Sequence, residues 1–252
     1  GPSQIVYVSQ IGADGTLGSW TASTSLPAAR TDHASVVTGD AMYVVGGAGA
    51  LDDVSVAPIR GNGSLGEWAK TASFVTPRSL HSLAEHNGKL YLVGGNNGTA
   101  AIADVQWASV RADGTVGEWK QRGTLPLARF GHTVEVYNGY LYVIGGRSDG
   151  YPGDGAWSNT IANVAITPIG DGGDVAGPLT YKALPVGLSE HVSAVLNGHL
   201  YVVGGVKGDG GSNSSVYYVT INDDGSLGAF RTPTLVPTHN TSDEFSLVTH
   251  GK

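Results

Sequence analysis

YNGYLYVIGG, residues 137–146, has three close relatives in the same chain: TGDAMYVVGG at 38–47, HNGKLYLVGG at 86–95 and LNGHLYVVGG at 196–205. Each stretch reads as a short apolar strand that follows a tight turn and stops at two glycines. The first glycines of the four pairs are 48, 51 and 59 residues apart. A period near fifty residues predicts repeated units that stack, because one such unit cannot bury its apolar faces alone.

Two further sequence markers recur with the same period as the glycine pairs. A Gly-containing turn ends in an aromatic residue five times, at Trp20, Trp68, Trp119, Tyr181 and Phe230. A His precedes the apolar region four times, at His33, His81, His132 and His191. Three markers in a fixed order indicate one repeated unit. The recurrent Trp residues are interpreted as packing between neighbouring units, which suits their large apolar area.

Local patterns turn one repeat into four strands. HASVVTG (33–39) and HTVEVYNG (132–139) are short β-rich runs that end in hairpin turns. The Gly-Gly run follows as a second strand, and IANVAITPI (161–169) alternates as a third. An Asp-Gly turn then leads to a fourth strand, which carries the aromatic residue. Because no helical period is present, the sequence predicts an all-β fold of four-stranded antiparallel blades.

With these markers the sequence resembles the kelch family of β-propellers. A kelch repeat carries Arg and His before the first strand, a double Gly after the second and a Trp in the fourth. The resemblance covers nearly the whole chain and implies a kelch-like propeller in a single domain, residues 1–252. It implies no single function, because kelch propellers serve as protein-binding, sugar-active and structural domains.

The ends of the chain predict about five blades, of which one is split between the termini and incomplete. QIVYVSQI (4–11) reads as a third strand, and SLVTHGK (246–252) matches SLAEHNGK (82–89), which precedes a glycine pair. The second strand of this split blade is missing. We expect either a longer chain with further blades or a strand from another copy, and therefore possible self-association. Gly1 and Pro2 are interpreted as the remnant of a purification tag.

The charge and composition of the chain argue against several classes of binding partner. A formal charge of -7 argues against nucleic acid and anionic membranes as partners. No apolar run approaches the roughly 20 residues of a membrane-spanning helix, so no membrane insertion is expected. The chain has no Cys, which excludes disulfides and thiolate metal sites. Its Gly, Ser, Thr and Asn content favours an extracellular or periplasmic setting.

One end of the blades is the predicted binding face. In an antiparallel blade the loop after Gly-Gly and the turn with Arg and His lie at the same end of the sheet. Arg30, Arg78 and Arg129 gather there and predict a site for an anionic ligand, because guanidinium groups match carboxylates. In kelch domains that bind acidic peptides, similar arginines line the mouth. The alternative is that each Arg bonds to backbone carbonyls between blades and holds the ring together.

The longest loop, RSDGYPGDGAWSNT (147–160), supplies the other predicted site residues. It carries Arg147, Tyr151, Asp154 and Trp157. An aromatic side chain near Asp and Asn favours a sugar ring, through stacking on its C–H face and hydrogen bonds to its hydroxyls. The alternative is that Trp157 covers a neighbouring blade.

Catalytic and metal signatures are scarce, so no cofactor, no metal and no catalytic residue are predicted. The copper oxidases that share kelch architecture need a Cys-linked Tyr, which this chain cannot form. Buried, hydrogen-bonded His residues between blades are favoured over a metal ring. A kelch-type sugar-acid epimerase or mutarotase is the enzyme alternative, with Glu190 or Glu244 for proton transfer.

The preferred interpretation is a non-catalytic binding module that holds a carbohydrate or an acidic peptide or protein on the loop face. A structural or adhesive repeat domain is the third hypothesis.

Overall fold

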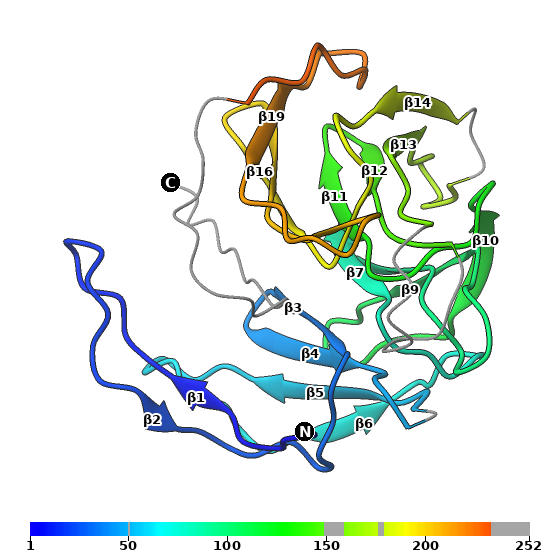
Figure 1. The fold of residues 1–252 in the computed structure, drawn as a ribbon. Coiled ribbons are helices and arrows are strands. Elements are labelled where there is room, and N and C mark those ends of the chain that lie inside the picture. Colours follow the sequence, from blue (N-terminus) through cyan, green and yellow to red (C-terminus); the bar gives the residue numbers. More distant parts are fainter. Residues whose placement is uncertain (50, 149–158, 176–178, 233–252) are drawn as a thin grey trace.

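The chain forms a β-propeller in a computed structural model, which describes residues 1–49, 51–148, 159–175 and 179–232 (Figure 1). Every regular element in these ranges is a strand. The described part of the chain thus contains no helix long and apolar enough to cross a membrane. The all-β prediction is confirmed.

Four blades follow one another along the chain, and in each the strands pair antiparallel in sequence order. Blade 1 holds β3 (Ala34–Thr38), β4 (Ala41–Val45), β5 (Val54–Pro58) and β6 (Ala69–Thr71). Blade 2 holds β7 (Ser82–His86), β8 (Lys89–Val93), β9 (Asp104–Ser109) and β10 (Lys120–Thr124). Blade 3 holds β11 (Thr133–Tyr137), β12 (Tyr140–Ile144), β13 (Asn163–Pro168) and β14 (Thr180–Ala183). Blade 4 holds β16 (Val192–Leu196), β17 (His199–Val203) and β19 (Val216–Thr220).

Smaller pairings complete the described chain. The bridge between Tyr218 and Arg231 marks the position of a fourth strand in blade 4. The short strands β15 (Leu188–Ser189) and β18 (Val206–Lys207) pair where blade 4 begins. At the N-terminus, β1 (Tyr7–Val8) pairs with β2 (Thr21–Ala22), and we call these two strands the N-terminal pair. The C-terminal part of the expected split blade, 246–252, lies outside the described residues.

The Asn-Gly turns have the backbone shape that the sequence requires. In blade 3, Tyr137 pairs with Tyr140 across a two-residue turn. Asn138 has φ 48° and Gly139 has φ 75°. Two positive φ angles in a two-residue hairpin match the right-handed twist of the strands, and Asn-Gly adopts them at low cost. Asn-Gly turns fix the register of the first two strands in blades 2, 3 and 4, whereas blade 1 uses Gly39 and Asp40 at this place.

The hydrophobic core consists of layers between consecutive blades. One layer joins blades 1 and 2 and includes Trp119, whose indole N–H donates to the carbonyl of Ala72 at 2.9 Å. A second layer joins blades 2 and 3, and a third joins blades 3 and 4. Hydroxyls also cross these layers: Tyr43 donates to the carbonyl of Gly114 at 2.8 Å. The prediction that the Trp residues pack between units is confirmed for Trp119, but it is wrong for Trp20, which is 62% exposed.

The glycine pairs are the points of closest approach between blades. A Cβ on Gly46 would lie 2.8 Å from the carbonyl oxygen of Arg78 and 2.9 Å from the ring of His81, both in blade 2. The next glycine, Gly47, donates its N–H to that same carbonyl at 2.9 Å. Blades 2 and 3 repeat this contact through Gly94, and blades 3 and 4 through Gly145. Gly-Gly in one blade and Arg or His in the next therefore form one interblade joint.

Candidate functional site

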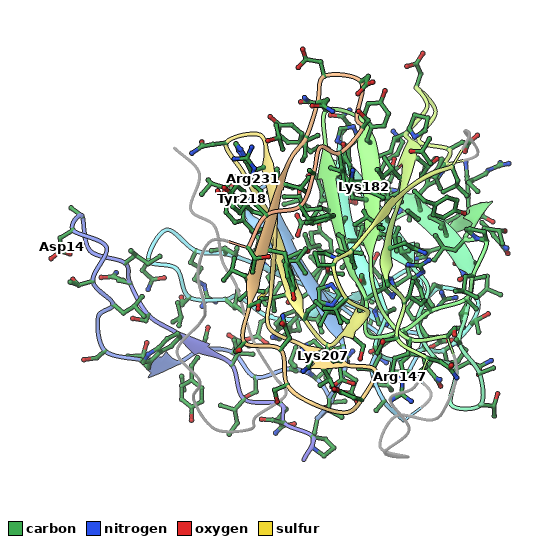
Figure 2. All side chains as sticks on the ribbon, turned by 45° about the horizontal axis from the view of Figure 1, so that its top comes forward. Asp14, Arg147, Lys182, Lys207, Tyr218 and Arg231 are labelled. Atoms are coloured by element: carbon green, nitrogen blue, oxygen red, sulfur yellow. The ribbon has the colours of Figure 1, made fainter. Side chains whose placement is uncertain are left out.

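The loops that follow the glycine pairs gather on one side of the propeller, which we call the loop face. Figure 2 shows two residues of these loops, Arg147 from blade 3 and Lys207 from blade 4, on the same side of the molecule. The turns that precede the first strands lie at the same end, because they hydrogen-bond to the glycine pairs. The loop face is therefore the end of the blades at which the sequence predicted the Arg and His turns to lie.

The arginines of the first two blades form ion pairs inside the ring. Arg30 donates through both terminal nitrogens to Asp53 at 3.1 Å, and Nη1 also donates to the carbonyl of Gly46 at 3.0 Å. Arg78 makes the same contacts with Asp104, at 2.9 Å for Nη2, and with the first glycine of its own blade. Neither Arg side chain has exposed surface. Each guanidinium thus satisfies the carbonyl at the end of the second strand.

Blade 3 lacks the carboxylate partner. Arg129 is fully buried and donates to the carbonyl of Gly145 at 2.9 Å, but the position of the Asp is taken by Asn163. Among the described residues neither Nη2 of Arg129 nor Oδ1 of Asn163 has a hydrogen-bond partner. Burial lowers the pKa of Arg129 to about 10, because desolvation disfavours the charged form.

In blade 4, the carbonyl of the first glycine is satisfied without an Arg. Leu188 occupies the Arg position. The side-chain amide of Asn213 comes from the following loop and donates to the carbonyl of Gly204 at 2.9 Å and to that of Ser215 at 3.1 Å. A neutral donor therefore replaces the guanidinium. All four blades share the need to satisfy this carbonyl, whichever side chain does it.

The predicted site residues that the structure describes are all buried. Arg30, Arg78 and Arg129 are buried, and each bonds to a backbone carbonyl as the alternative expects, but that carbonyl belongs to the same blade and not to a neighbouring one. Arg147 is also buried, with its guanidinium 5.3 Å from the centre of the Phe130 ring. Tyr151, Asp154 and Trp157 lie outside the described residues. A ligand role for these residues stays a prediction.

The repeated His residues are buried except at the start of the ring. His81, His132 and His191 are buried in the joints, whereas His33 is exposed. Burial lowers the pKa of His81 to about 3 and that of His191 to about 4, and it holds the pKa of His132 well below its usual value. These rings are therefore neutral at pH 7. No three His, Asp or Glu side chains of the described ranges cluster closely enough to hold a metal ion.

A cleft of about 390 Å³ lies on the loop face between blades 1 and 2. Loop residues 47–49 line it from blade 1, and residues 77–79 and 96–98 line it from blade 2, together with Asp32. Its volume lies within the range of small-molecule sites. The walls are divided about equally between polar and apolar surface. Arg78, the one cation in the lining, is already paired with Asp104.

Asn96 stands out in this lining. Its Oδ1 accepts the N–H of Gly98 at 2.7 Å, which fixes the orientation of the amide. Its Nδ2 is buried and has no hydrogen-bond partner among the described residues. A buried donor without an acceptor costs about 1–3 kcal/mol. Asn96 is therefore a residue of the cleft wall whose buried amide donor has no partner among the described residues.

A second hollow, of about 680 Å³, follows the first strands of all four blades at the centre of the ring. Glu135 lines it and accepts a hydrogen bond from Ser193 at 2.7 Å. Burial raises the pKa of Glu135, and the Ser193 bond acts in the opposite direction. The carboxyl group of Glu135 in this central hollow is thus more easily protonated than an ordinary Glu.

Sequence and structure comparisons agree with this architecture. The kelch motif model matches residues 128–161, which run through the first two strands of blade 3. The chain is a β-propeller that carries a kelch motif in its third blade. No curated protein matches it significantly in sequence.

A solved structure described as "Structure of YjhT" shares the kelch propeller fold with a TM-score of 0.68 and 14% identity. The match covers 85% of this chain and 67% of that chain. It is one of 240 solved chains that match significantly. At this identity the likeness shows the fold alone.

Asn96 belongs to none of the repeated markers of the sequence. The residue that follows each glycine pair differs between blades: it is Ala48, Asn96, Arg147 or Val206. Ring packing requires the glycines, whereas the next residue is free to vary. Asn96 and Arg147 are both polar at this variable position, and their polarity was the available signal.

Because Arg78 has a carboxylate partner and Arg129 has none, substitutions at Asp104 and Asn163 should change the free energy of unfolding in opposite directions. Asp104→Asn should lower the free energy of unfolding by about 3 kcal/mol, because the buried Arg78 loses its counter-ion. Asn163→Asp should raise the free energy of unfolding, because Arg129 gains the carboxylate that Arg78 already has. Urea unfolding measures both variants. Destabilisation of similar size in both would contradict this account of the joint.

The buried His residues predict a loss of stability in mild acid. A folded pKa below the unfolded value of about 6.5 means that the unfolded chain takes up protons first as the pH falls. The stability that the neutral rings contribute is complete above pH 6.5 and is lost as the pH falls towards 4. With three such rings the slope approaches about 4 kcal/mol per pH unit.

Unfolding in urea at pH 7, 6 and 5 checks this slope. Most Asp and Glu carboxylates stay ionised in that range, and the raised pKa of Glu135 opposes the trend at one site only. A free energy of unfolding that does not change between pH 7 and 5 would show that the rings are protonated within the fold.

Proposed function

We propose that the propeller is a non-catalytic binding domain that holds a carbohydrate on its loop face, in the cleft between blades 1 and 2. The unused amide donor of Asn96 is the observation that carries this proposal. An acceptor on a ligand, such as a sugar hydroxyl or ring oxygen, would complete its hydrogen bonding. Ser79 and Asn97 add a hydroxyl and a second amide to the lining.

Charge favours a neutral sugar over an acidic peptide as the ligand. The arginines expected to attract an anion are buried, and those of blades 1 and 2 are already neutralised by Asp53 and Asp104. Asp32 adds a carboxylate to the cleft, which would repel acidic side chains. A hydroxylated ligand suits amides and carbonyls fixed on a rigid frame, because little ordering is needed on binding.

The enzyme alternative has one observation in its favour. Glu135 lines the central channel, and burial raises its pKa, as a group for proton transfer requires. Glu190 lies at the inner end of the loop face, where its backbone N–H bonds to the carbonyl of Gly131 at 2.7 Å. Glu244 lies outside the described residues. A sugar-acid epimerase remains the second candidate on the strength of Glu135.

The test is a glycan array read with a matched pair of variants. Asn96→Asp keeps the shape and the acceptor that holds Gly98 but removes the amide donor, so binding should fall at least tenfold. Asn62→Asp makes the same chemical change in a turn where the equivalent residues Asp14, Asp113 and Asp224 already hold the same hydrogen bonds. It should leave binding unchanged.

Three results would redirect the proposal. Equal binding by Asn96→Asp and the parent protein would contradict the cleft. Binding lost only in Trp157→Ala would move the site to the long loop of blade 3. Turnover of a bound sugar acid that is lost in Glu135→Gln would favour the enzyme.

A further inference from the structure

The ion pair that blades 1 and 2 share is incomplete in blade 3. In each of these blades the first glycine donates its N–H to the carbonyl of one residue: Asp53, Asp104 or Asn163. The three residues therefore occupy the same position of the repeat. Asp53 and Asp104 neutralise the Arg of their own blade. Asn163 carries no charge and cannot do the same for Arg129.

The guanidinium of Arg129 is fully buried, and no described carboxylate pairs with it. Its Nη1 donates to the carbonyl of Gly145 at 2.9 Å, and its Nε donates to that of Leu127 at 3.4 Å. Its Nη2 has no partner among the described residues. Burial lowers the pKa of Arg129 to about 10, so the group still carries its charge at pH 7. A buried charge without a counter-ion is strongly destabilising, and an ion held beside Nη2 would remove that cost.

The position of the absent carboxylate can be reached from solvent. The side chains of Asp53 and Asp104 keep 16% and 14% of their surface exposed, and Asn163 is half-buried at the same position. Oδ1 of Asn163 is buried and has no partner in the described part of the chain. Rotation of this amide by a half-turn exchanges its oxygen and nitrogen without a change of shape. Nδ2 then becomes a second donor, beside Nη2 of Arg129, for one small ion.

We propose that blade 3 binds a small monovalent anion of the chloride class, held by Nη2 of Arg129 and the side-chain amide of Asn163. The anion takes the place of the carboxylate oxygen that lies 2.9 Å from Nη2 of Arg78 in blade 2. The folded chain binds it and the unfolded chain does not, so the anion stabilises the fold. The site goes beyond the proposed carbohydrate function, since it lies in blade 3 and takes an inorganic ion.

Charge and size select the ion. One negative charge neutralises one guanidinium, as Asp104 does for Arg78. Because Arg129 has no exposed surface, only an ion small enough to be enclosed with it can reach Nη2. A single water could accept from Nη2 and donate to Oδ1 of Asn163, but it would leave the positive charge uncompensated. Dependence of stability on chloride therefore separates an anion from a water.

A chloride titration at constant sodium concentration tests the site on the whole chain. Sodium chloride replaces sodium gluconate, whose anion is too large to be enclosed beside Arg129. The midpoint of thermal unfolding should rise in a saturable manner, by about 2–4 °C once chloride exceeds its dissociation constant about fivefold. In a crystal grown with bromide, an anomalous scattering peak should lie within hydrogen-bond distance of Nη2 of Arg129.

Three variants make the test specific. Asn163→Asp supplies the carboxylate from the chain itself, so it should raise the thermal midpoint in chloride-free buffer and abolish the response to chloride. Asn62→Asp makes the same chemical change in an exposed turn and should keep the full response. Asp104→Asn creates the same Arg and Asn pair in blade 2 and should add a second chloride-dependent rise.

Two results would overturn the proposal. A chloride response of equal size in Asn163→Asp and the parent protein would place the ion elsewhere. A parent protein whose midpoint ignores chloride, or a bromide-containing crystal without a peak at Arg129, would show that no anion occupies the position.

Discussion

The propeller depends on the close approach of one blade's glycine pair to the next blade's Arg or Leu carbonyl and His ring. Gly94 illustrates the constraint, because a Cβ there would lie 2.6 Å from the carbonyl oxygen of Arg129 and 2.8 Å from the ring of His132. No side chain larger than hydrogen fits. The adjacent Gly95 donates its N–H to the same carbonyl at 2.8 Å. Packing and hydrogen bonding thus meet at one point in each joint.

The buried polar groups follow from this close approach. Once the second strand ends against the next blade, its last carbonyl is out of reach of water and needs a donor. Arg30 and Arg78 supply one and are in turn neutralised by an Asp. Blade 3 keeps the Arg without the Asp, and blade 4 uses Asn213 instead. The blades therefore share a requirement rather than a residue.

The repeated features could be predicted from the sequence, and the individual ones could not. Period, turn chemistry and alternation gave the strand order, because each rests on local backbone physics. The role of Arg78 in satisfying a carbonyl followed from its repetition. Its partner Asp104 was missed, because the Asp stands ten residues after its glycine in blade 2 but seven in blade 1, where loop lengths differ.

The candidate site could be predicted least well from the sequence. The cleft exists only because loops from two blades meet, and no local pattern reports where they do so. Asn96 became notable once its amide was seen to be buried without an acceptor. The long loop of blade 3 drew attention through composition, and Tyr151, Asp154 and Trp157 within it lie outside the described residues. Irregular loops on a rigid frame vary in length and composition, which is why local sequence patterns do not report how they meet.

The most direct test of the central claim compares two glycines that share a backbone shape but differ in surroundings. Gly94 has φ 55° and no room for a Cβ, whereas Gly88 has φ 68° and nothing within 4 Å of one. Gly88→Ala should lower the free energy of unfolding by about 1 kcal/mol, the cost of the left-handed backbone. Gly94→Ala should cost about 3 kcal/mol or more, because the clash adds to that cost. Equal losses in urea unfolding would show that the joint tolerates a side chain and would contradict this account.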